Sequence, residues 1–102
     1  MLIQDILGNT LRIRKMFTDT DTGELTDVDN LLVSVIKSST TVVTYTEADT
    51  DVISKEATGV YAIKLATIAT AIFATSGYYT IYTDCEYVGD VYRSKDTLQL
   101  RT

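Results

Sequence analysis

The chain has 102 residues, of which 45% are hydrophobic and 23% charged, a composition typical of one globular domain and not of a disordered or membrane protein. Its net charge of −5 argues against nucleic-acid binding, because affinity for phosphates comes largely from lysine and arginine. A single cysteine, Cys85, excludes an internal disulfide, and the lack of histidine excludes Ser-His-Asp and Cys-His catalysis and a histidine-ligated zinc site. We therefore expect no enzymatic activity and no cofactor.

The N-terminal residues lack the basic and apolar regions of a signal peptide, and the mostly apolar run 62–74 is too short to span a bilayer. The chain is therefore expected to fold in the cytoplasm and to bind no membrane. Seven tyrosines, frequent threonine, valine and isoleucine, and the absence of proline and tryptophan favour pleated, half-buried surfaces. These frequencies predict an all-β domain.

Residues 1–9 are expected to form an N-terminal arm or a short edge strand, since the Gly8-Asn9 pair is a turn signal. The apolar side chains of this segment need a partner. We therefore predict contacts with neighbouring subunits through its apolar residues Leu2, Ile3, Ile6 and Leu7.

The first clear strand covers residues 10–18. Its core face carries Leu11, Ile13 and Phe17, and Lys15 is the exception to this alternation. Arg12 lies on the opposite face, which is expected to be solvated.

An acidic loop follows, with Asp and Gly residues typical of a turn. Residues 19–23 also spell D-x-D-x-G, the opening of a calcium loop, but the twelfth position is Asn30 where an EF-hand carries a bidentate glutamate. A connecting turn is therefore expected. An ion site is the alternative, with Asp19, Asp21 and Asp27 as its candidate ligands.

The strand at residues 31–37 is apolar on both faces. Leu31, Val33 and Val35 lie on one face, and Leu32 and Ile36 lie on the other. In a two-sheet sandwich the outer face normally contacts water. Leu32 and Ile36 are therefore predicted to meet another subunit; cover by a loop or by the N-terminal arm is the alternative.

Further strands are expected at residues 41–46 and 59–65, and residues 78–87 and 91–100 are expected to form a hairpin with its turn at 88–90. The alanine-rich segment 66–75 has apolar residues at helical spacing and predicts a short helix or loop, with strand continuation as the alternative. About seven strands at this spacing indicate an antiparallel β-sandwich over residues 10–102.

Tyrosines in the last hairpin admit two uses. Tyr78 and Tyr82 share a face, and tyrosines stack on sugar rings, so this face is a candidate ligand face with surface-glycan contact. Tyrosines also fill cross-strand pairs and oligomer interfaces.

The order of five motifs carries a resemblance to a known family. They are G-N-T-L-R-I-R from residue 8, D-x-x-T-G-E-L-T-D from 19, N-L-L-V-S-V from 30, I-S-K-E-A-T-G-V-Y from 53 and G-Y-Y-T-I-Y from 77. This order resembles the small immunoglobulin-like domains of tailed-bacteriophage virion proteins. The resemblance covers nearly the whole chain and implies an immunoglobulin-like sandwich.

The resemblance also implies a non-enzymatic structural component of the virion: a head-to-tail connector or neck protein, a tail protein or a capsid decoration. Its partners would be copies of itself and other virion proteins, after assembly in the host cytoplasm. Such domains are generally repeated around a symmetry axis. A carbohydrate- or host-surface-binding accessory module is the alternative.

Overall fold

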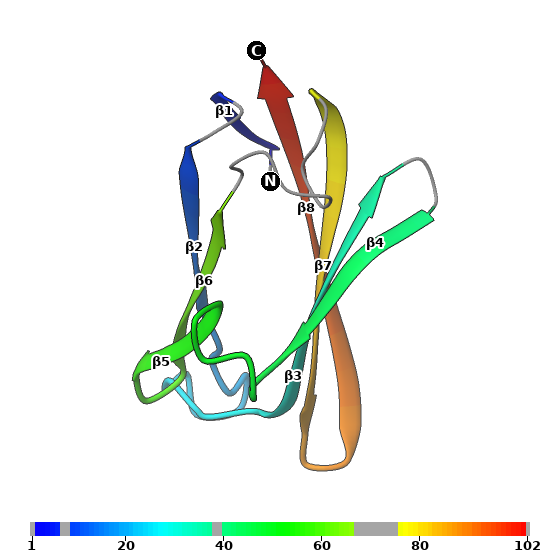
Figure 1. The fold of residues 1–102 in the computed structure, drawn as a ribbon. Coiled ribbons are helices and arrows are strands. Elements are labelled where there is room, and N and C mark those ends of the chain that lie inside the picture. The colour runs from blue at the N-terminus through cyan, green and yellow to red at the C-terminus, as the bar shows by residue number, and fades with distance from the viewer. Residues whose placement is uncertain (1, 7–8, 38–39, 67–75, 102) are drawn as a thin grey trace.

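Eight β-strands follow one another along the residues that the computed structural model describes, 2–6, 9–37, 40–66 and 76–101 (Figure 1). No helix occurs in these ranges, so the all-β prediction is confirmed. The strands are β1 (Leu2–Ile6), β2 (Thr10–Met16), β3 (Asp29–Lys37), β4 (Thr40–Thr46), β5 (Ile53–Ala57), β6 (Val60–Ala66), β7 (Gly77–Tyr87) and β8 (Asp90–Arg101).

The strands form two sheets, one with the order β1-β8-β7-β3-β4 and one with the order β2-β6-β5. In the naming used for immunoglobulin domains, β8, β7, β3 and β4 are strands G, F, C and C′, and β2, β6 and β5 are strands B, E and D. The predicted immunoglobulin-like sandwich is confirmed. Among the described residues from 10 onward there are seven strands, β2 to β8, and all of their pairings are antiparallel. The eighth strand, β1, lies in the segment expected to be an arm or edge strand and runs parallel to β8, so the larger sheet is mixed.

Alternating side chains of the two sheets build the core. In β3, Leu31, Val33 and Val35 are buried, while Leu32 and Ile36 between them are half-buried on the outer face. Because side chains alternate along a strand, one apolar row from each strand meets a row of the other sheet. The fully buried large side chains include Leu31, Ile63, Leu65, Tyr79, Ile81, Leu98 and Leu100.

Lys15 breaks the apolar pattern of β2 because it pairs with a carboxylate inside the sandwich. Its ammonium group forms an ion pair with Asp96 of β8, and the two side chains are only 16% and 4% exposed. The pair joins the two sheets. An interior charge is tolerated when it has a charged partner and hydrogen bonds, which accounts for the exception seen in the sequence.

Gly59 fixes the loop between β2 and β3 against the turn between β5 and β6. It has a φ of 69°, and a Cβ atom there would lie 2.7 Å from the backbone nitrogen of Thr26 and 2.9 Å from the carbonyl oxygen of Phe17. The Phe17 N–H donates to the Gly59 carbonyl at 2.8 Å, and the Gly59 N–H donates to Asp27 at 2.8 Å. Only glycine fits this close approach.

The predicted helix or loop at 66–75 lies outside the described residues, except for Ala66 at the end of β6. Nowhere in the described part of the chain is a helix long and apolar enough to cross a membrane.

Candidate functional site

The hairpin of β7 and β8 extends past the three-stranded sheet. In Figure 1 its turn lies below the ends of β2, β5 and β6. Near the turn, Cys85, Tyr87 and Tyr92 belong to the rows that face the sandwich interior, as their register along the hairpin shows. A pocket of about 510 Å³ lies between these rows and the segment from Met16 to Val28.

Asp19 fastens the loop wall of this pocket to the hairpin. One carboxylate oxygen accepts the N–H groups of Asp21 at 2.8 Å and Thr22 at 3.3 Å, and the other accepts the Tyr87 hydroxyl at 2.6 Å. The Tyr87 bond and then the backbone bond from Asp21 lower the pKa of Asp19 below its usual 3.8. The same Asp19 bond raises the pKa of Tyr87. The loop therefore folds as an Asp-initiated turn with a fixed position.

The three candidate ion ligands do not converge. Asp27 bonds Lys55 Nζ at 2.5 Å and the Gly59 N–H at 2.8 Å, and its pKa is lowered chiefly by the Lys55 hydrogen bond. The Asp19 carboxylate accepts a hydrogen bond from the Tyr87 hydroxyl, and Asp21 is exposed. Within the described residues, no group of three or more Cys, Asp or Glu side chains is arranged to hold a metal ion. The acidic segment here forms a turn.

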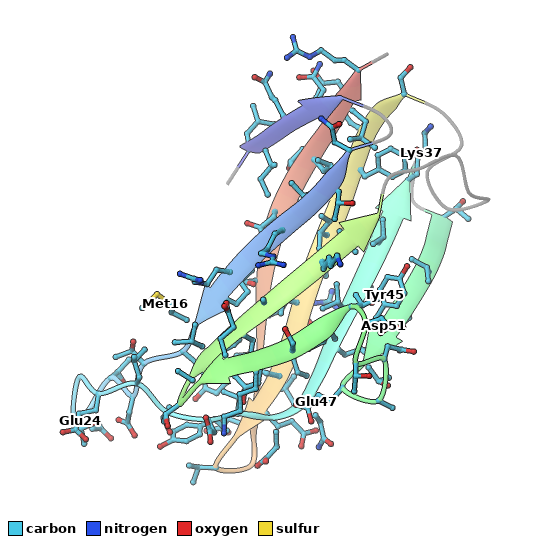
Figure 2. The ribbon with its side chains drawn as sticks, turned by 60° about the vertical axis from the view of Figure 1, so that its left-hand side comes forward. Met16, Glu24, Lys37, Tyr45, Glu47 and Asp51 are labelled. Atoms are coloured by element: carbon cyan, nitrogen blue, oxygen red, sulfur yellow. The ribbon has the colours of Figure 1, made fainter. Side chains whose placement is uncertain are left out.

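Large apolar side chains are exposed around the pocket mouth. Met16 at the end of β2 is 63% exposed and projects to solvent (Figure 2), Val88 is 81% exposed and Tyr92 is 52% exposed. Val91, on the other face of the hairpin, is 70% exposed. We call the surface formed by Met16, Asp21, Val88, Asp90 and Tyr92 the hairpin end.

The turn of the hairpin places a valine in an unfavourable backbone conformation. Val88 has a φ of 51° and Gly89 a φ of 80°, so both residues of the turn lie in the left-handed region. Two-residue turns of this kind favour Asn, Asp or Gly at both positions, and a β-branched residue there is a steric outlier. The turn therefore holds an exposed apolar residue in a strained backbone conformation.

The hairpin end also carries negative charge. Asp21 and Asp90 line the pocket, both are exposed, and neither carboxylate forms an ion pair with any residue that the structure describes. In Figure 2, Glu24 lies at this lower end of the molecule and Lys37 at the opposite end. The pocket lining thus combines apolar and aromatic side chains with threonines and carboxylates, and the exposed Asp21 and Asp90 are among the latter.

The residues predicted to contact other subunits lie outside the hairpin end. Leu2 is 58% exposed on the edge strand β1, whereas the partly buried side chain of Ile3 packs against the core of its own domain. The side chain of Ile6 and the whole of Leu7 lie outside the described residues. Leu32 and Ile36 are half-buried on the outer face of the five-stranded sheet.

The two candidate ligand-face tyrosines differ in access. Tyr78 is 62% exposed, and the neighbouring Gln99 accepts a hydrogen bond from the side chain of Gln4 at 2.8 Å. Tyr82 is half-buried because the Arg93 guanidinium lies over its ring, 4.5 Å from the centroid. Only Tyr78 presents an open ring beside polar groups.

Sequence reasoning did not find the hairpin end. It placed a turn at 88–90, and the described turn residues are Val88 and Gly89. The available signal was a valine where a short hairpin turn usually carries Asn or Asp, between Tyr87 and Tyr92.

Comparison with known proteins identifies the fold without a family. No family model matches the chain, and no curated protein matches it. A solved structure of an endo-beta-1,4-mannanase from Thermotoga petrophila superposes with a TM-score of 0.65 at 14% sequence identity. The match covers 98% of this chain but only 17% of the mannanase chain. At this identity the likeness shows the fold alone.

Proposed function

We propose that the chain is a non-enzymatic structural protein of a tailed-bacteriophage particle, which acts through contacts with copies of itself and with other virion proteins. The order of sequence motifs supports the phage setting. The observation that carries the contact role is the hairpin end, where apolar side chains surround a pocket beside unneutralised carboxylates. Exposed apolar surface of this kind marks protein-binding sites.

The strained and exposed valine in the turn of the hairpin supports the same proposal. Val88 is 81% exposed, so it contributes little to the core of its own chain. A left-handed conformation costs a residue with a Cβ about 1–2 kcal/mol. A contact between Val88 and a partner protein would account for both the exposure and the strain.

Incorporation into particles tests the proposal. Tagged full-length chain is produced during infection, particles are purified on a density gradient, and the chain is quantified by mass spectrometry. Val88→Asn with Tyr92→Ser is expected to reduce incorporation, and Tyr78→Ser, which changes an exposed aromatic residue outside the hairpin end, is the matched control. Absence of the unaltered chain from purified particles contradicts the proposal.

A carbohydrate- or host-surface-binding accessory module is the second candidate. The exposed ring of Tyr78 beside the Gln4–Gln99 pair favours it, since an aromatic face flanked by amides suits a sugar ring. A similar fold also forms about a sixth of a mannanase chain. On a glycan array, this candidate predicts binding that Tyr78→Ala abolishes and Tyr82→Ala retains. The structural proposal predicts a blank array.

A further inference from the structure

The pocket at the hairpin end has the chemistry to accept a long cationic side chain. Met16 and Tyr92 line the pocket and are exposed, so they offer apolar and aromatic surface to the aliphatic stem of such a side chain. Asp21 and Asp90 stand at the rim as hydrogen-bond acceptors for an ammonium or guanidinium group. Asp19 is not available, because Tyr87 and two backbone N–H groups occupy its carboxylate.

The chain itself carries an unneutralised cationic pair. Arg12 of β2 and Lys64 of β6 are direct cross-strand partners, and both are exposed. Neither forms an ion pair with a residue that the structure describes, whereas Arg14, on the same face of β2, is paired with Glu56 at 3.1 Å. Like charges directly opposite each other destabilise a sheet. In a chain of net charge −5, a carboxylate supplied from outside would relieve this repulsion.

We propose that the hairpin end of one copy binds the Arg12/Lys64 face of a second copy. This inference rests on the proposed structural role and names its contact. The pocket opens where the hairpin passes the end of the smaller sheet, while Arg12 and Lys64 project from the outer face of that sheet. The proposed contact is heterologous: the hairpin end of one copy meets the Arg12/Lys64 face of the next, and each copy of a pair keeps one of these surfaces unused. Repetition of the contact builds a ring if the rotation closes and a filament if it does not.

A charge exchange tests the contact with the full chain. The acid-reversed variant is Asp21→Lys with Asp90→Lys, and the base-reversed variant is Arg12→Glu with Lys64→Glu. Sedimentation velocity at about 0.1 M salt, where the Debye length is about 10 Å, measures self-association over a concentration series. The unaltered chain is expected to associate, and each variant alone to associate about 100-fold more weakly.

A mixture of the two variants distinguishes a lost contact from a misfolded chain. The lysines of one variant then face the glutamates of the other, so the mixture is expected to recover association, and so is the chain carrying all four substitutions. Recovery requires folded partners, so it also excludes misfolding as the cause of the loss. Lys95→Glu with Arg101→Glu changes the net charge as much as the base reversal, but on β8, and is expected to leave association unchanged.

A monomeric unaltered chain, or association that survives either reversal, overturns the inference. So does a failure of the mixture to associate. The proposed function is tested separately, by incorporation into particles. If the chain enters particles but its self-association does not respond to the charge reversals, this contact alone is refuted. If association follows the charge exchange as expected but the chain never enters particles, the phage role alone is refuted.

Discussion

Substitution of Val88 by asparagine is expected to stabilise the domain. Val88 has a φ of 51° and is 81% exposed, so its replacement relieves backbone strain and removes almost no buried apolar area. A left-handed conformation costs an ordinary residue about 1–2 kcal/mol, and asparagine tolerates it far better than a β-branched residue. We expect the free energy of unfolding to rise by about 1 kcal/mol. For a domain of this size, that gain raises Tm by about 4–8 °C.

Urea unfolding and calorimetry measure this gain at concentrations where the chain is monomeric, because association would add to the apparent stability. The matched control is Val91→Asn: Val91 is 70% exposed in β8 and is not among the described residues with positive φ. Asparagine is disfavoured in strands, so this control is expected to lose stability. If Val88→Asn is no more stable than the unaltered chain, the strain argument is wrong.

Three further predictions concern the interior, the loop and pH. Lys15→Met should cost about 3–5 kcal/mol, because it leaves the Asp96 carboxylate without its lysine inside the sandwich, and adding Asp96→Leu should recover most of that loss in urea unfolding. Gly59→Ala should destabilise more than Gly23→Ala in the same assay: both have positive φ, but a Cβ at Gly59 meets a backbone nitrogen at 2.7 Å and one at Gly23 meets no atom within 4 Å. The lowered pKa of Asp19 adds stability that is complete above the ordinary pKa of 3.8 and is lost as pH falls through the lower folded value. The fall of the urea midpoint between about pH 5 and pH 2 should therefore be smaller in Asp19→Asn, and an unchanged fall would contradict the assignment.

Period-two alternation explains how much of the fold the sequence could predict. The buried row Leu31, Val33 and Val35 was predicted from its spacing, because a strand with one buried face must repeat every second residue. The short strand β5 was not predicted, since only Ile53 among its five residues is buried and the rest are exposed. The parallel pairing of β1 with β8 joins residues about as far apart as the chain allows, and no local pattern specifies it.

The candidate site depended on contacts between distant residues. The Asp19–Tyr87 bond joins residues 68 positions apart, so the loop and the hairpin could not be placed together from sequence. The cover of Tyr82 by Arg93 follows from the register of β7 against β8, which the turn at 88–89 sets. The sequence shows that Tyr78 and Tyr82 share a face, but only the fold shows that the Tyr78 ring is the one exposed to solvent.

Quantification of this chain in purified particles tests the central claim most directly. Particles are banded on a density gradient, and the amount of the chain relative to the major capsid protein is measured by mass spectrometry. The proposed structural role predicts a fixed number of copies per particle, which falls when Val88 is replaced by asparagine and Tyr92 by serine. A chain that stays in the unbound fraction at every stage of assembly, and binds glycans through Tyr78 instead, would contradict it.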